Sequence, residues 1–172
     1  NNIIMIKLIL IQIVKMAQDV KMAQDVKMAQ DVKMAQDNLC AEARTIYNKL
    51  RHMLPDHLIM EPVIFGEAVR LIMENKEPDC IVDIYFSNSP VPGGTQILTA
   101  SNGRRWRFVD HHYFHNQPDY TANLLVMSLD GHMSARLGCN PGECIRDIER
   151  RILHARGGRV ELDVLERLRE YN

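Results

Sequence analysis

Apolar residues between positions 39 and 54 recur at spacings of three and four, which is the period of one face of an α-helix. Pro55 ends this pattern, so we predict an amphipathic helix over residues 39–54. A second helix is predicted to begin at Pro62, because proline favours the first helical position, and to end near Asn75. The predicted buried residues of this second helix are Ile64, Ala68, Leu71 and Ile72.

Two tight hairpins are predicted in the middle of the chain. Residues 96–101 and 104–109 flank Asn102-Gly103, a pair suited to a type I′ turn because both central residues of that turn need positive φ. Residues 123–129 and 132–137 flank Asp130-Gly131 in the same way. The polar segment 111–120 between the hairpins predicts a loop.

The remaining elements are a strand before the hairpins and two helices after them. The run from Cys80 to Phe86 is rich in β-formers, and the proline- and glycine-rich segment 87–94 predicts a loop. Asn140, followed by a proline and then an acidic residue, is typical of a helix N-cap, and Gly157-Gly158 is expected to end that helix. The expected buried residues of the two helices are Ile145, Ile148 and Ile152, then Val164, Leu165 and Leu168.

These elements predict an α+β fold. Their order is two helices, an antiparallel meander of about five strands with two tight hairpins, and two helices, with the helices packed on one face of the sheet. A length of 172 residues with 46% hydrophobic content fits one domain, which we place at residues 38–172. Residues 1–37 are set apart as an N-terminal extension.

The extension is built on an identical six-residue repeat. KMAQDV occurs three times over residues 15–32, and KMAQD follows at 33–37. A period of six advances by about 600° on an α-helix, so the apolar residues walk around the helix instead of forming a coiled-coil seam. We therefore predict a flexible or marginally helical segment. The preceding stretch 3–14 is apolar but falls short of the ~20 residues of a membrane span, so no membrane partner is predicted.

Composition limits the possible partners and compartment. With 21 Lys and Arg against 22 Asp and Glu, the net charge of -1 gives no global field, so binding to nucleic acid needs a local basic patch. The four cysteines are too few and too dispersed for a secreted disulfide framework. We expect an intracellular protein, cytoplasmic or nuclear, and predict no cofactor.

The best candidate patch lies on the second strand of the first hairpin. Arg104, Arg105, Trp106 and Arg107 combine guanidinium groups with an aromatic ring, a combination that can stack on bases and grip phosphates. Alternation along a strand places Arg105 and Arg107 on one face and Trp106 with Phe108 on the other. If the aromatic residues are core, these two arginines face solvent. Further basic residues that could help are Arg150, Arg151, Arg156 and Arg159.

Two groups of residues could hold a metal. His111 and His115, within the cluster Asp110, His111, His112 and His115, have the four-residue spacing that suits a metal on a helix, although a solvated loop is the simpler interpretation. Cys139 and Cys144 form a looser pair than the Cys-x-x-Cys of zinc sites, and a loop thiol beside a core thiol explains them as well.

A series of landmarks runs through residues 86–137: Phe86, Ser89, Gly93-Gly94, Leu98, Gly103, Trp106, Phe108 and the stretch Met133-Ser-Ala-Arg-Leu137. In this order they resemble a FLYWCH-type finger, a small β-rich zinc module of transposon-related and chromatin proteins. Leu125-Val126-Met127 stands where that family has Trp-x-Cys, Met133 replaces its second cysteine, and no His-Asn-His follows. Since a thioether is a poor zinc ligand, the resemblance implies a degenerate, metal-free relative.

Three functional hypotheses follow. The leading one is a non-catalytic interaction module that binds nucleic acid or another protein through the arginine strand. A second, from a different class, is a small metal-dependent hydrolase or nuclease that uses Asp110, His111, His112 and His115. A third is a homo-oligomeric structural protein assembled through exposed strand edges or the extension.

Overall fold

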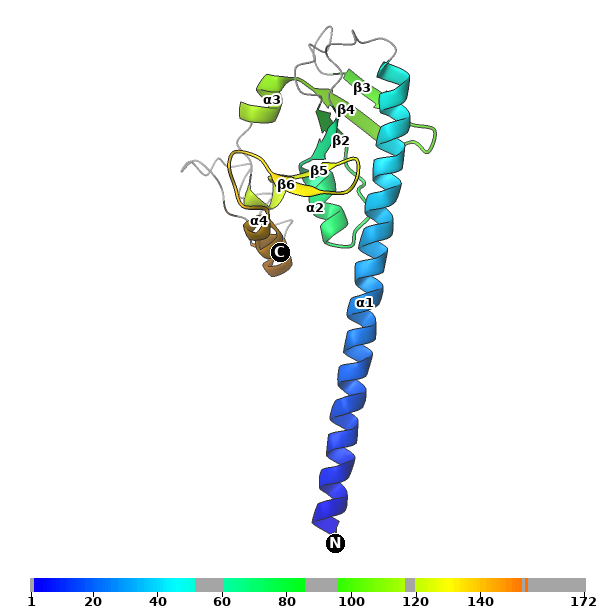
Figure 1. Ribbon diagram of the computed structural model, residues 1–172, viewed down its shortest axis with the longest axis vertical. Helices are drawn as coiled ribbons and strands as arrows, with labels where there is room; N and C mark the ends of the chain where they lie inside the picture. The colour runs from blue at the N-terminus through cyan, green and yellow to red at the C-terminus, as the bar shows by residue number, and fades with distance from the viewer. Residues whose placement is uncertain (1, 52–60, 86–95, 117–119, 153, 155–172) are drawn as a thin grey trace.

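The computed structural model describes residues 2–51, 61–85, 96–116, 120–152 and 154. A helix of 50 residues, α1 (Asn2–Arg51), leads into a domain of helices and a six-stranded sheet. Figure 1 shows this domain beside the C-terminal part of α1, with the rest of the helix projecting away from it. The other helices are α2 (Glu67–Met73), α3 (His111–Asn116), the 3-10 helix η2 (Thr121–Asn123) and α4 (Pro141–Arg150).

The sheet consists of two hairpins on either side of a central strand pair. Its strands are β1 (Val63–Phe65), β2 (Val82–Tyr85), β3 (Gln96–Thr99), β4 (Arg105–Val109), β5 (Leu125–Ser128) and β6 (Met133–Ala135). Their order is β3-β4-β2-β1-β5-β6, and β2 with β4 is the parallel pair in an otherwise antiparallel sheet. The predicted combination of helices with a mostly antiparallel sheet is confirmed. The predicted meander of about five strands is wrong, because the sheet has six strands in the described residues and β2 and β1 lie between the two hairpins.

The second predicted helix is wrong at its start. Val63–Phe65 is strand β1, the chain turns at Gly66 with φ 78°, and α2 begins only at Glu67, so Pro62 precedes a strand. Two of the three residues of β1 are β-branched, and β1 pairs with β2 on one side and with β5 on the other. These pairings outweigh the helical spacing of the apolar residues.

Both predicted hairpins are confirmed, but the predicted turn type is wrong. A type I′ turn needs positive φ at both central residues. Gly103 has φ 84°, whereas Asn102 is not among the described non-glycine residues with positive φ. The amide of Gly103 donates to the carbonyl of Ala100 at 2.9 Å, and that of Gly131, with φ 83°, donates to Ser128 at 2.9 Å. This is the pattern of a type I turn that ends in a left-handed glycine.

The predicted start of α4 is confirmed, and its predicted end is wrong. Asn140 Oδ1 accepts a hydrogen bond from the amide of Gly142 at 2.8 Å, as an N-cap does. The helix ends at Arg150, because Arg151 adopts the left-handed conformation with φ 54°. Gly157-Gly158, the last predicted helix and the predicted loop 87–94 lie outside the described residues. Of the predicted buried face, Ile148 is buried, Ile145 is partly buried and Ile152 is exposed.

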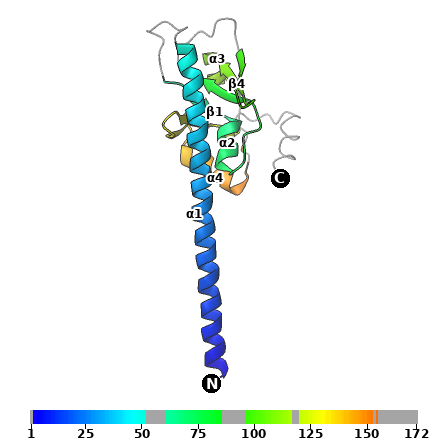
Figure 2. The ribbon, with the colours of Figure 1, turned by 90° about the vertical axis from the view of Figure 1, so that its right-hand side faces the viewer.

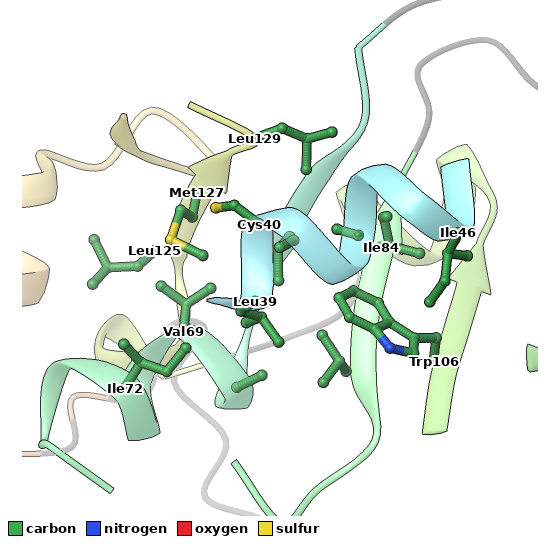
Figure 3. Packing of buried hydrophobic residues seen from close by; sticks show 14 of the residues in the cluster. Leu39, Cys40, Ile46, Val69, Ile72, Ile84, Trp106, Leu125, Met127 and Leu129 are labelled. Atoms are coloured by element: carbon green, nitrogen blue, oxygen red, sulfur yellow. The ribbon is translucent and has the colours of Figure 1, made fainter. Parts of the chain in front are cut away.

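The C-terminal part of α1 supplies one side of the hydrophobic core. The predicted apolar face is confirmed where the structure describes it, with Leu39, Ala43, Ile46 and Tyr47 all buried. Figure 3 shows Leu39 and Ile46 beside side chains of α2 and of the central strands. Trp106, from β4, is fully buried at 0% exposure. The helix, α2 and the sheet therefore share one core.

A polar contact fixes α1 to the first hairpin. Trp106 Nε1 donates a hydrogen bond to Glu42 Oε1 at 2.8 Å. Arg104 Nη1 and Asn102 Nδ2 donate to Glu42 Oε2 at 3.2 Å and 3.1 Å. Since a buried indole N–H requires an acceptor, the Glu42 carboxylate satisfies Trp106 and joins the helix to the hairpin at the same time.

The helix continues without a break through the repeats. Lys, Met, Ala and Gln all favour helix, and Lys33 forms an ion pair with Asp37 one turn later at 2.7 Å. Contact with the core reaches back to Val32 and Ala35, which are partly buried against it. Residues 5–30 are exposed, and both views show the N-terminal part of α1 projecting away from the domain (Figures 1 and 2). The division at residue 38 stays a prediction, and the contacts begin within the third repeat.

We expect a chain that lacks residues 1–30 to keep the cooperative thermal unfolding of the domain, because the described side chains of that segment are all exposed. A chain that lacks residues 1–43 is the matched comparison. It loses Leu39 and Ala43 from the core and also Glu42, which bonds to Trp106. We therefore expect it to unfold without a cooperative transition. Calorimetry of both chains tests this, and loss of the transition in the chain 31–172 would contradict the structure.

Candidate interaction surfaces

The alternation predicted for the arginine strand is confirmed on β4. Trp106 and Phe108 are buried in the core, and Arg105 on the other face is exposed. Trp106 therefore cannot stack on a base, because its ring is covered on all sides by the protein. The aromatic half of the predicted patch is core.

Two of the three arginines are already engaged by carboxylates. Arg107 Nη2 donates to Asp83 Oδ2 at 2.8 Å, and its Nε donates to Asp83 Oδ1, so the two side chains form a bidentate pair. The hydrogen bond to Asp83 raises the pKa of Arg107 above its ordinary value. Arg104 bridges Glu42 and Glu77. Arg105 is the member of this group that faces solvent.

The other predicted arginines do not join this group. Arg150 and Arg151 are exposed at the end of α4. That helix packs against β5, β6 and η2, whereas β3 and β4 lie at the opposite end of the strand order. Arg156 and Arg159 lie outside the described residues. The described basic residues are therefore spread over two ends of the sheet.

Replacing Arg107 by alanine should lower the free energy of unfolding by about 1–3 kcal/mol. The reason is that Asp83, whose side chain is only 13% exposed, would lose its bidentate partner. Arg105→Ala is the matched control on the same strand and should change stability by no more than about 0.5 kcal/mol. Urea unfolding of the two variants measures the difference, and equal effects would show that the Asp83–Arg107 pair does not form in solution.

The predicted histidine cluster lies on α3, so the expectation of a loop is wrong for residues 111–116. Asp110 Oδ1 accepts a hydrogen bond from the amide of Tyr113 at 2.7 Å and so caps the start of this helix. His111 and His115 lie one turn apart with ring centroids separated by 4.1 Å. The helical spacing noted in the sequence is real.

Two stacked aromatic rings contact both histidines. Tyr85 and Phe114 stack at 4.2 Å with planes 7° apart. The Tyr85 hydroxyl lies 2.9 Å from His111 Nδ1, and the ring of His115 meets Phe114 edge-on at 4.9 Å. Desolvation lowers the pKa of His115, and the charges of His111 and Arg136 lower it further.

The two cysteines predicted as a zinc pair differ in environment. Cys144 is fully buried in the core, and its burial raises the pKa of the thiol to about 11. Cys139 is partly buried against the same core. The two thiols therefore match the simpler interpretation, in which Cys144 is a core residue. Within the described ranges, His, Cys, Asp and Glu side chains do not gather in groups of three that could hold a metal.

The most unusual surface belongs to the projecting part of α1. Eight large apolar side chains between residues 5 and 14 are 52–60% exposed: Met5, Ile6, Leu8, Ile9, Leu10, Ile11, Ile13 and Val14. They cover the helix on all sides, because Lys7 and Gln12 are the polar residues of this segment. The described helices include none with the length and apolar character needed to cross a membrane. This apolar run is visible in the sequence, where its short length excludes a membrane span. The sequence does not show that its side chains are exposed.

Comparison with known proteins adds little about function. The chain matches no protein-family model and no curated protein. Among solved structures, "The structure of CCA-adding enzyme apo form I" is similar to part of it, with 15% sequence identity and a TM-score of 0.43. The match covers 58% of this chain and 30% of that enzyme chain, and this score is too low to assign a shared fold or function. The resemblance to a FLYWCH-type finger stays a prediction.

Proposed function

We propose that this protein is a non-catalytic interaction module that joins copies of itself through the apolar N-terminal segment of α1. The observation that carries the proposal is the exposure of eight large apolar side chains between Met5 and Val14. A helix that is apolar all round is stable in water only when it is covered. Nothing in the described domain covers this one, since contact with the core begins at Val32.

The repeats between the apolar segment and the domain suit a spacer. Residues 15–32 are three copies of the repeat, and they form no continuous apolar face because a period of six moves around the helix. At 1.5 Å per residue, this stretch is about 27 Å long. It holds the apolar segment away from the domain, where a partner can surround it.

A second copy of the chain fits the surface better than a charged partner does. The four repeats at 15–37 contain four Lys and four Asp, so this stretch carries no net charge that would keep two copies apart. The apolar segment carries Lys7 as its one charge. The eight exposed apolar side chains form one contiguous surface, and exposed apolar surfaces of this kind mark sites of association.

Nucleic acid has less support as a partner. The described patch retains Arg105, because Arg104 and Arg107 are paired with carboxylates and Trp106 is buried. Phosphate contacts need several free cations to produce a useful affinity. The hydrolase hypothesis rests on the histidines of α3, and two histidines do not by themselves provide a nucleophile and a base.

Light scattering of the intact chain and of the chain 31–172 tests the proposal. The intact chain should have a mass that is a multiple of 19.8 kDa and that falls on dilution. The shortened chain, which retains the domain, should be monomeric at the same concentration. A monomeric intact chain would rule the proposal out.

A further inference from the structure

His111 and His115 bring two imidazole rings together on one face of α3. The two residues are four positions apart on α3, so their side chains leave the same face of the helix. Their ring centroids are 4.1 Å apart and the ring planes are inclined by 47°. Both side chains are exposed, so an ion can reach them from solvent.

The neighbouring rings restrict the two imidazoles before any ion binds. The ring of His115 is nearly perpendicular to those of Phe114 and Tyr85, with centroids 4.9 Å and 6.1 Å away. His111 is held by the hydroxyl of Tyr85, 2.9 Å from its Nδ1. Tyr85 itself is buried and stacked on Phe114, so its position is fixed by the core. Ligands that are already ordered lose less entropy on binding an ion.

The Tyr85 hydroxyl also suits the tautomer that metal binding needs. A metal on Nε2 of His111 requires the proton on Nδ1, and the Tyr85 oxygen is placed to accept that hydrogen bond. Histidines that bind metals nearly always donate their second ring N–H to a neighbouring oxygen. The contact between Tyr85 and His111 is therefore the arrangement expected next to a metal ligand.

We propose that His111 and His115 bind one divalent transition-metal ion that prefers imidazole nitrogen, such as Ni²⁺, Cu²⁺ or Zn²⁺, with Tyr85 positioning His111. Water or a group from a partner completes the coordination. Oxygen-preferring ions such as Mg²⁺ are excluded, because both protein ligands are nitrogens. This site is on the domain and does not depend on the association of α1.

Calorimetric titration of the intact chain, carrying no added histidine tag, with NiCl₂, CuCl₂ and ZnCl₂ tests the site. We expect one ion to bind per chain and MgCl₂ to give no heat. His111→Gln and His115→Gln should each weaken binding at least tenfold. Glutamine is chosen because it keeps a side chain of similar size, so that α3 stays folded. His132→Gln is the matched control, because this exposed histidine lies at the turn between β5 and β6 and not on α3, so the variant should bind like the original chain.

Tyr85→Phe separates positioning from direct ligation. The substitution keeps the stacked ring and removes the hydroxyl, so we expect metal affinity to fall by about tenfold while the thermal transition stays cooperative. Equal affinities for the original chain and both glutamine variants, or binding that disappears in His132→Gln, would overturn the site. An unchanged affinity in Tyr85→Phe would remove the role of Tyr85.

Discussion

Replacing Trp106 by alanine will lower the free energy of unfolding by about 3–5 kcal/mol. The side chain is fully buried at 0% exposure, between α1 and the central strands. Its removal leaves a large cavity and takes away the hydrogen bond that Nε1 donates to Glu42. Chemical unfolding of the variant measures this loss directly.

Glu42→Ala shows how much of the stability lost in Trp106→Ala comes from the hydrogen bond and how much from the buried ring. It leaves the indole in the core but deprives Nε1 of its acceptor and Arg104 of one carboxylate, so we expect a smaller cost of about 1–3 kcal/mol. Trp106→Ala and Glu42→Ala should not add, because both remove the same contact. A Trp106→Ala variant that loses less than about 1 kcal/mol would show that the indole is not in the core.

Replacing Ile9 and Ile13 by lysine will weaken self-association at least about 100-fold, since each 1.4 kcal/mol of binding energy is tenfold. The two side chains lie one turn apart in the apolar segment and are 52% and 55% exposed. A partner that covers this face would have to bury two unpaired ammonium groups, which costs several kcal/mol. Light scattering over a dilution series gives the change.

Gln18→Lys with Gln24→Lys is the matched control for that variant. It adds the same two charges to the same helix, at exposed positions within the spacer. If the apolar segment is the interface, this control should associate nearly as well as the original chain. Equal weakening by both pairs of substitutions would mean that added charge, and not the covered apolar face, controls association.

The sequence was most informative where a short stretch decides its own structure. Asn140 and the proline after it gave the start of α4, and the two glycine turns gave both hairpins. Even there the predicted turn type was wrong. A left-handed glycine fits both a type I′ turn and a type I turn with one extra residue, and the pair Asn102-Gly103 alone does not decide between them.

Elements that depend on distant partners could not be predicted in this way. The three residues of β1 are stabilised by β2 and β5, which lie about 20 and 60 residues away in the chain. The helix spacing of Ile64 with Ala68 suggested a helix instead. The order of the sheet has the same cause, since parallel pairing of β2 with β4 leaves no local pattern in either strand.

On the candidate surfaces too, features set by a short stretch were predictable, and contacts between distant residues were not. Alternation gave the correct faces for Trp106 and Arg105 but could not show that Asp83, on a neighbouring strand, takes up Arg107. Glu42 drew no attention in the sequence, because a glutamate on a predicted helix is normally solvated; its contact with Trp106 spans 64 positions. The pair His111 and His115 was visible from spacing alone, but Tyr85, which holds one of them, was not.

Hydrogen exchange along α1 tests the central claim most directly, because it reports which segment of the helix is covered. We expect amides of residues 5–14 to exchange more slowly in the intact chain than in the Ile9→Lys, Ile13→Lys variant at the same concentration. Amides of α2 and β4 should exchange equally in the two proteins, since both retain the domain core. Identical exchange of residues 5–14 in the two proteins would contradict the proposal that this segment joins copies of the chain.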